Sequence, residues 1–296
     1  MKWSKILLHV AAALTCARSG AACGTCGCGD ATLTALGSEK PYQNRVRTSL
    51  ELRYRSEEIG RANVDRISMR EARADAHLAW APHERAFIAL SAPLVHRTVG
   101  YVNEAESVVT GVGDVALRVK AFVAQDSPAF PRHLLAVVFG LSVPTAAMQR
   151  DSEGALLPME MQIGTGSWDP ALGVSYAYFP RPWSFYSSVQ GSSPLRDTAT
   201  FRASPSLRAS LSLQRQFSLR FAARLSVDTR LDAKAFENGQ SERDSGGLVG
   251  FVSPELLLSP MPDVLLGLSA RLPVAQALAG YHREGPIWGA VVSYDL

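Results

Sequence analysis

The sequence lacks any long hydrophobic run after its first thirty residues. A helix that crosses a bilayer needs about 20 consecutive, mostly apolar residues, and no stretch of even about 18 is present there. Transmembrane helices are therefore excluded from the body of the chain. Hydrophobic residues still make up 47% of the 296 residues, which excludes extensive disorder. If the protein lies in a membrane, it must cross that membrane as β-strands.

The chain also lacks a net charge outside its N-terminus. Residues 1–22 hold three of the 30 basic residues and none of the 27 acidic ones, so the remainder is balanced. This segment has a basic start, an apolar run over 6–16 and small residues up to Ala22, which is the arrangement of a secretory signal peptide. We expect cleavage near Ala22 and export of the rest. No block of Lys and Arg interleaved with aromatic residues occurs, so no nucleic acid partner is predicted.

What the sequence does contain is a repeated alternation of apolar and polar residues. In RVRTSLELRYR, from Arg45 to Arg55, apolar side chains recur at every second position opposite charged ones. A period of two predicts a β-strand with two different faces. About twelve such segments lie near 45–55, 66–80, 85–95, 112–125, 133–145, 170–179, 183–193, 203–214, 217–229, 247–258, 264–275 and 287–296.

The connections between these segments alternate in length. Short ones such as APHE at 81–84 and QRQF at 214–217 take turns with longer ones that are rich in Gly and charge. The longer connections lie near 96–111, 146–169, 230–246 and 276–286. Short turns at one rim and long loops at the other are typical of an outer-membrane barrel. We therefore predict an all-β fold over residues 45–296, a transmembrane antiparallel β-barrel of about 12 strands with short periplasmic turns and longer extracellular loops.

A soluble sandwich of two sheets alternates in the same way and is the alternative fold. Two features favour the barrel. Charged residues recur in mid-strand on one face, as a wet lumen requires, and aromatic residues crowd the short-turn ends like an interfacial girdle. These aromatic residues are Trp80, Phe87, Phe130, Tyr176, Tyr178, Phe179, Trp183, Phe185, Tyr186 and Phe217. The expected location is the outer membrane of a Gram-negative-type cell, in contact with outer-membrane lipid.

Three segments carry a resemblance to a known family. They are GVGDVALRVK at 111–120, FGLSVPT at 139–145 and QIGTGSWDPALGVSYAY at 162–178. The matching residues are Gly113, Asp114, Gly140, Pro144, Thr145, Gly164, Gly166, Ser167 and Asp169. In these segments the chain is similar to the outer-membrane family named for the meta pathway of phenol degradation, whose members are often simply called transporters. It departs at Ala146, where a Gly often follows the Thr. The resemblance implies an outer-membrane barrel with small-molecule passage and without established catalytic residues.

The sequence shows no catalytic constellation. GTGSWDP at 164–170 has neither the Gly-x-Ser-x-Gly of a nucleophile elbow nor the Lys of a P-loop, so we interpret it as a rim turn in which Ser167 or Asp169 bonds a local amide. The histidines of the exported part, at 77, 83, 96, 133 and 282, are scattered singly, and only His77 should face the lumen in mid-strand. We therefore predict that the protein is not an enzyme.

The charged face of the strands is the candidate functional surface. The residues expected to line the lumen for transport are Arg47, Arg53, Arg73, Asp75, Arg118, Lys120, Arg208, Arg220, Arg224 and Arg271. Basic residues predominate in this set, and rings of basic side chains in a pore favour anions. The alternative is that opposite charges pair across neighbouring strands and stabilise a barrel that does not conduct. We predict an outer-membrane pore or transporter for small molecules, anionic or aromatic, through a charge-lined lumen.

The cysteines are few but clustered, and they suggest a different functional class. Three of the four lie in CGTCGCGD at 23–30, on an expected periplasmic tail over residues 23–44. Cys23, Cys26 and Cys28 could hold Zn or Cu(I), or form one disulfide with an odd thiol left over, or begin the exported chain with a lipid-modified Cys23. The alternative function is a non-conducting structural or binding barrel whose tail binds a metal or a redox partner in the periplasm. No other cofactor is predicted.

Overall fold

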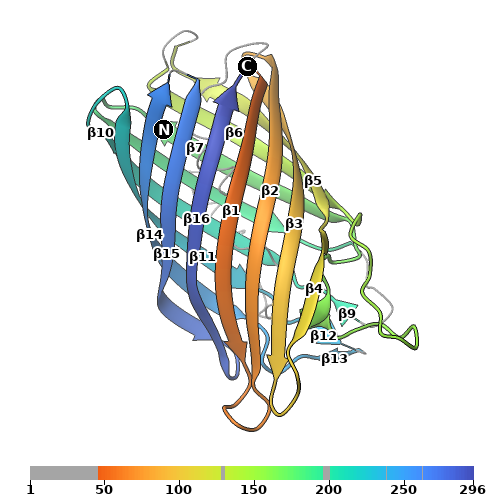
Figure 1. Ribbon diagram of the computed structural model, residues 1–296. Coiled ribbons are helices and arrows are strands. Elements are labelled where there is room, and N and C mark those ends of the chain that lie inside the picture. The colour runs from red at the N-terminus through yellow and green to blue at the C-terminus, as the bar shows by residue number, and fades with distance from the viewer. Residues whose placement is uncertain (1–45, 128–130, 196–200, 238, 262) are drawn as a thin grey trace, which may run out of the picture.

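Antiparallel strands close into a barrel in the computed structural model, which describes residues 46–127, 131–195, 201–237, 239–261 and 263–296 (Figure 1). Within these ranges, no helix is long and apolar enough to cross a membrane. The predicted signal peptide and the cysteine tail both lie outside the described residues, so these two expectations stay predictions.

In the described ranges, the strands fill twelve positions in the barrel wall, and their order around the barrel follows the chain. They are β1 (Val46–Ile59), β2 (Ile67–His83), β3 (Ala86–Tyr101), β4 (Ser107–Val112), β5 (Val115–Gln125), β6 (His133–Val143), β7 (Asp169–Tyr178), β8 (Trp183–Ser192), β10 (Ser206–Gln216), β11 (Phe221–Asp232), β14 (Gly247–Met261), β15 (Val264–Leu278) and β16 (His282–Asp295). β4 and β5 share one position, because both pair with β3 and only Gly113 and Asp114 separate them. β1 pairs with both β2 and β16, so the sheet closes on itself.

The predicted antiparallel barrel of about twelve strands is thus confirmed, but two of the predicted long loops are wrong. Most of 96–111 belongs to β3 and β4, and only residues 279–281 separate β15 from β16. Some of the charged residues that look loop-like in the sequence are tolerated in these strand ends because they face the lumen. Arg97 and Glu284, for example, are buried on the inner face.

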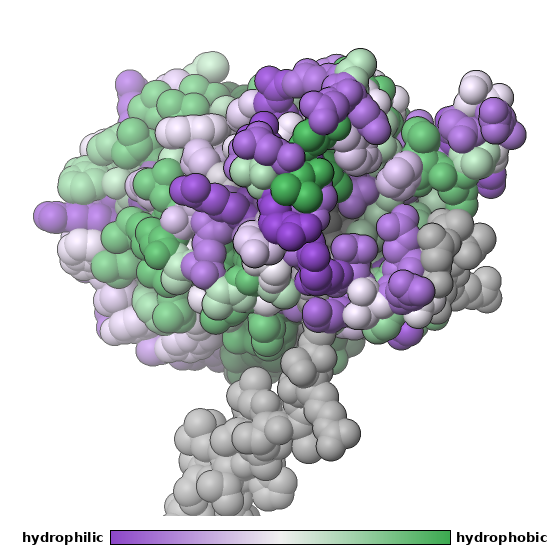
Figure 2. Space-filling model, turned by 90° about the horizontal axis from the view of Figure 1, so that it is seen from below, coloured by the Kyte–Doolittle hydropathy of each residue, from purple (hydrophilic) through white to green (hydrophobic). Residues whose placement is uncertain are grey.

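The wall strands present an apolar face outward, and most of them present a polar face inward. In β1, Leu50, Leu52 and Tyr54 are exposed, whereas Glu51 and Arg55 between them are buried. Exposed apolar side chains recur around the wall, and lipid is the solvent that suits them. Viewed from the long-loop end, Figure 2 shows many hydrophilic side chains across the mouth of the barrel, with hydrophobic patches toward the circumference.

The aromatic girdle at the short-turn rim is only partly as predicted. Trp183 and Phe217 are exposed on the outer wall, where a girdle residue must lie. Phe87 is instead buried inside the barrel, with Phe179 and Tyr186 packed against the same cluster. Position near a rim alone does not say which face an aromatic ring takes, because a shift of one residue along a strand reverses its face.

The long connections lie together at the other rim, at the bottom of Figure 1. Three short strands form a small second sheet there: β9 (Phe201–Arg202), β12 (Phe236–Glu237) and β13 (Gln240–Ser241). Arg243 pairs with both Asp65 and Asp244, and the Tyr281 amide donates to Asp244 as well. The hydrogen bond from Arg243 lowers the pKa of the Asp244 carboxyl below its usual range. The loops of three different connections are therefore bonded to one another.

Candidate functional site: a cavity in the lumen

An apolar cluster fills part of the lumen near the short-turn rim. Its buried members are Ala79, Ala81, Phe87, Ala89, Phe122, Leu134, Ala136 and Ala177, which come from β2, β3, β5, β6 and β7. Small alanines surround the rings of Phe87 and Phe122, whose centroids are 6.4 Å apart. This packing closes the lumen on the side formed by these strands.

The connection between β6 and β7, residues 144–168, folds into the other end of the lumen. It contains a short 3-10 helix, η3 (Met159–Met161). The last residue of η3 and Ile163 pack against Met69 and Val95, which face inward from β2 and β3. We call this connection the inward loop. Its apolar contacts with the inner wall fix the inward loop inside the lumen.

A buried arginine holds the inward loop in place. Arg97 of β3 is 2% exposed and donates from Nη1 to the carbonyl oxygens of Glu160 and Gln162, at 2.9 and 2.7 Å. Its Nε donates to Glu71 of β2 at 2.9 Å. A charged group is buried here with nearly all its hydrogen-bonding capacity used, as burial of a charge requires.

The residues of the family resemblance meet at the base of the inward loop. The carboxylate of Asp114 accepts hydrogen bonds from the amides of Ala146 and Thr165, at 3.0 and 2.7 Å. The Thr145 hydroxyl accepts the Val115 amide at 2.9 Å. Segments that are distant in sequence are thereby joined, and the motif has a structural role in anchoring the loop.

The glycine at 164 belongs to the same junction. A Cβ added at Gly164 would lie 2.5 Å from the Ala146 Cβ and 2.6 Å from an oxygen of Asp114, so no larger residue fits. No strand or helix covers 164–168, in keeping with the predicted turn. The predicted hydrogen bond from a local amide to Ser167 or Asp169 differs from the observed one. The Thr165 amide donates to Asp114, and Asp169 accepts a hydrogen bond from the Thr165 hydroxyl at 2.8 Å.

Most inward charges form ion pairs across one side of the lumen. We call this side, formed by β1, β2, β3, β11, β14, β15 and β16, the ion-paired wall. Its pairs include Arg53–Asp75 at 2.6 Å, Arg73–Asp75 at 2.8 Å, Arg55–Glu71 at 3.1 Å, Arg224–Glu255 at 3.1 Å and Arg271–Asp228 at 2.9 Å. These contacts agree with the alternative interpretation of the charges, in which opposite charges pair across strands and stabilise the barrel.

The inner face of β7, β8 and β10 is different, and we call it the serine wall. Its inward positions include Ser175, Ser184, Ser188, Gln190, Ser192, Ser206, Arg208, Ser210 and Ser212. These side chains are short and neutral except for Arg208, which lies directly across from Gln190 in the strand register. Short polar side chains leave space in the lumen, and this space suits water because its surface is polar.

The ten residues predicted to line the lumen are found in several settings. Arg53, Arg73, Asp75, Arg224 and Arg271 belong to the ion-paired wall, and Arg118, Lys120 and Arg208 face inward from β5 and β10. Arg47 pairs with Asp295, where the ends of β1 and β16 meet.

The position predicted for Arg220 is wrong. It is exposed and lies in the turn before β11, not in the wall. The Phe217 amide donates to the carbonyl of Phe221, and the Ser218 hydroxyl accepts the amides of Arg220 and Phe221. This turn uses residues that the alternation alone assigns to the strand.

One cavity of about 180 Å³ lies in the lumen between the apolar cluster and the inward loop. It brings together five predicted residues, namely Arg53, Arg73, Asp75, Arg118 and Arg208. His77 also lines it, as its mid-strand position predicts. Gln190, Asp169 and Ser204 also line the cavity and are not among the residues predicted to face the lumen. Strand alternation could have identified Gln190, whereas the other two depend on how the connections fold.

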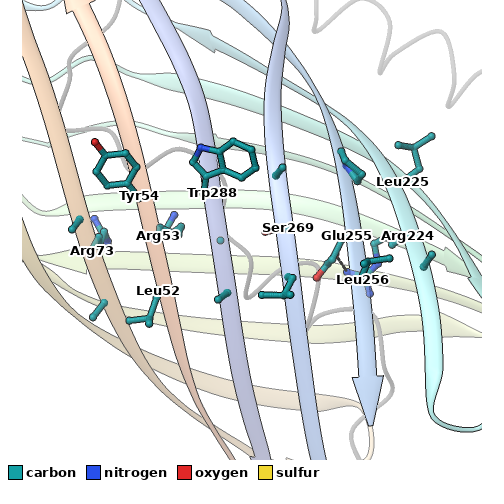
Figure 3. Close-up of a pocket in the computed structure, with 18 of the residues that line it drawn as sticks. Leu52, Arg53, Tyr54, Arg73, Arg224, Leu225, Glu255, Leu256, Ser269 and Trp288 are labelled. Carbon is teal, nitrogen blue, oxygen red and sulfur yellow. Dashed lines mark hydrogen bonds and ion pairs between the residues drawn. The ribbon is translucent and has the colours of Figure 1, made fainter. Parts of the chain in front are cut away.

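A larger hollow of about 1,280 Å³ lies against the outer wall and is not a candidate site. Its lining includes the outward residues Leu52, Tyr54, Leu225, Leu256 and Trp288, labelled in Figure 3. Figure 3 also shows the inward residues of the same strands, with Arg224 and Glu255 joined by their ion pair. Because its side chains are those that face lipid, this surface is suited to acyl chains.

One group of side chains in the described residues could offer ligands to a metal ion. Glu57, His282 and Glu284 place one ligand atom each within 4.8 Å of one another. His282 Nε2 is already bonded to Glu57, and Glu284 is paired with Arg230. The three groups are thus engaged within the protein, as members of the ion-paired wall. The predicted metal ligands Cys23, Cys26 and Cys28 are not among the described residues.

The closed sheet and its apolar outer face define an outer-membrane β-barrel. Comparison of the sequence with family models and with curated proteins gives no match. Among solved structures, the chain is similar to an outer membrane channel from Pseudomonas putida F1, with a TM-score of 0.69 and 12% identity over 87% of this chain and 97% of that one. It is also similar to the translocator domain of the autotransporter NalP from Neisseria meningitidis, with a TM-score of 0.56 and 8% identity over 88% and 91%. At these identities the likeness concerns the fold, and the resemblance to the phenol meta-pathway family stays a prediction.

Proposed function

We propose that the protein is an outer-membrane pore for small polar molecules, with a preference for anions. The observation that carries the proposal is the lumenal cavity, where Arg118 and Arg208 stand beside the short side chains of the serine wall. The similar fold of the Pseudomonas putida F1 protein, described as an outer membrane channel, supports passage through the lumen. The cavity is smaller than the roughly 300–1,000 Å³ of sites for drug-sized ligands, so the solute is small.

An anionic solute has better support than an aromatic one. No Phe, Tyr or Trp occurs among the described residues that line the cavity. The described lining has four arginines and three aspartates, so basic side chains still outnumber acidic ones. Positive charge in a narrow pore attracts anions and repels cations. We therefore expect the pore to select its solutes by their charge and not by aromatic stacking.

Planar bilayer recording of the purified full-length chain tests this function. In a KCl gradient, we expect the wild-type reversal potential to show anion preference, and Arg118→Glu to lower the anion-to-cation permeability ratio roughly several-fold, because the change reverses a charge in the lumen. Arg220→Glu is the matched control and should leave selectivity near wild type, since Arg220 lies in an exposed turn.

Two outcomes would contradict the proposal. A well-folded barrel that stays silent in the bilayer would exclude a pore and favour the non-conducting alternative, which deletion of residues 23–36 would then test. Equal selectivity in wild type and Arg118→Glu would remove Arg118 from the conduction path. Folding of each variant is checked by the difference in gel migration between unboiled and boiled samples.

A further inference from the structure

Buried polar atoms without a partner gather around the lumenal cavity. Within the described residues, this is true of Arg208 Nε, Gln190 Oε1, Asp169 Oδ1, the Ser204 hydroxyl and His77 Nδ1, which are shielded from solvent and form no hydrogen bond. All five residues line the cavity. Each buried polar atom without a hydrogen-bond partner costs about 1–3 kcal/mol of stability. Several such atoms around one cavity therefore indicate that water or a polar solute occupies the cavity in the functional protein.

The acidic groups around the cavity are mostly engaged elsewhere. Asp75 is bonded by Arg53 and Arg73, and the oxygens of Asp114 accept two amides of the inward loop. Across the part of the chain that the structure describes, Arg208 forms no ion pair with any carboxylate. A partly buried guanidinium in that position is matched best by an anion that enters from outside the protein.

Two of the remaining atoms without a partner are hydrogen-bond acceptors. Gln190 Oε1 and Asp169 Oδ1 can accept hydrogen bonds, and Gln190 lies directly across from Arg208 in the register of β8 and β10. A solute that fits must therefore present an anionic acceptor to Arg208 and hydroxyl donors a few ångströms away. Water can bond these atoms when no solute is bound, and a solute with the same groups can replace it.

We propose that the cavity binds a small hydroxylated carboxylate, such as a hydroxy acid or a sugar acid. The carboxylate accepts from Arg208, and the hydroxyl groups donate to Gln190 and Asp169. This inference deepens the proposed function and rests on it for the route by which the solute arrives. The binding site itself consists of wall and loop residues and can be measured without conduction.

Calorimetry of the full-length protein in detergent tests the site with three probes of similar size. Glycerate carries a carboxylate and hydroxyls, propionate carries only the carboxylate, and glycerol carries only hydroxyls. We expect glycerate to bind at least about tenfold more tightly than either of the others, because each of them lacks one half of the recognition.

Two variants test which residue recognises the carboxylate of glycerate and which recognises its hydroxyl groups. Arg208→Gln should weaken glycerate binding about tenfold or more and bring it close to that of glycerol, because the carboxylate loses its cation. Gln190→Leu should weaken glycerate and leave propionate unchanged. Arg215→Gln is the matched control, since Arg215 lies on the same strand but over the ring of Trp183 at the rim, and it should bind like wild type.

The outcomes separate this inference from the pore itself. Equal binding of the three probes, binding of none of them, or an unchanged glycerate affinity in a folded Arg208→Gln would overturn the site, even if bilayers show conduction. Glycerate binding that depends on Arg208 in a barrel that does not conduct would support the site and overturn the pore.

Discussion

The ion-paired wall and the serine wall are built from the same alternating pattern but use their inward positions differently. On the ion-paired wall, residues such as Glu71 and Arg97 are almost fully buried and bonded to one another. On the serine wall, most side chains are short, and Arg208 has no carboxylate partner among the described residues. The first wall fills its half of the lumen, and the second leaves the cavity open.

The difference teaches that an inward charge in a barrel is not by itself a pore residue. A charge that meets an opposite charge on the next strand is neutralised, and what it contributes is structure. A charge opposite neutral side chains keeps its field and can act on a solute. Only a few of the predicted arginines are in the second situation.

The largest expected effect is the loss of a pair in the ion-paired wall. Glu71 accepts hydrogen bonds from both Arg55 and Arg97. Glu71→Gln removes the carboxylate that Arg97 shares with Arg55, while Arg55 keeps Glu57, so we expect the free energy of unfolding to fall by about 3–5 kcal/mol. Urea unfolding of the protein in lipid vesicles, followed by tryptophan fluorescence, measures it.

Glu106→Gln is the matched control for this change. Glu106 pairs with Arg70, but both side chains are about half exposed, at 55% and 51%. Exposed pairs contribute less than about 1 kcal/mol, so this variant should unfold nearly like wild type. Equal losses in the two variants would show that burial is not what gives the ion-paired wall its strength.

A smaller effect is expected at the base of the inward loop, where the two walls are separated by the cavity. Gly164→Ala forces the new Cβ against Asp114 and Ala146, so we expect a cost of about 1–3 kcal/mol and faster proteolysis of the loop. Gly191→Ala is the control, since nothing lies closer than 3.9 Å to its Cβ. Equal protease resistance of both variants would mean that the junction does not hold the loop.

The smallest effect is expected where the serine wall meets the ion-paired wall, between Ser212 of β10 and Ser226 of β11. The hydroxyls of Ser212 and Ser226 are 2.8 Å apart and buried. Ser212→Ala leaves the Ser226 hydroxyl without this partner and should cost about 1 kcal/mol, while replacing both by Ala should recover much of the loss. A cost as large as that of Glu71→Gln would erase the proposed distinction between the walls.

Much of the barrel could be predicted from alternation, because the face of each strand follows from its period of two. Glu51 and Leu52 lie on opposite faces as predicted, and His77 faces the lumen. Errors arose where a turn or a strand end decides the outcome. The alternation predicts Arg220 in a strand that in fact begins one residue later, and the pairing partners of Arg224 and Arg271 depend on which strands lie close together in the barrel.

The alternation in the sequence was enough to favour a chain that crosses a membrane as strands over a soluble sandwich, and to predict for most strand positions which side chains face lipid. It did so because both properties depend on local periodicity and on the solvent that each face requires. Only the tertiary structure decided which charges cancel, because ion pairs join strands such as β11 and β14 through their register. It also decided that the inward loop enters the lumen and bounds the cavity at Arg208, because that closure brings together residues far apart in the chain.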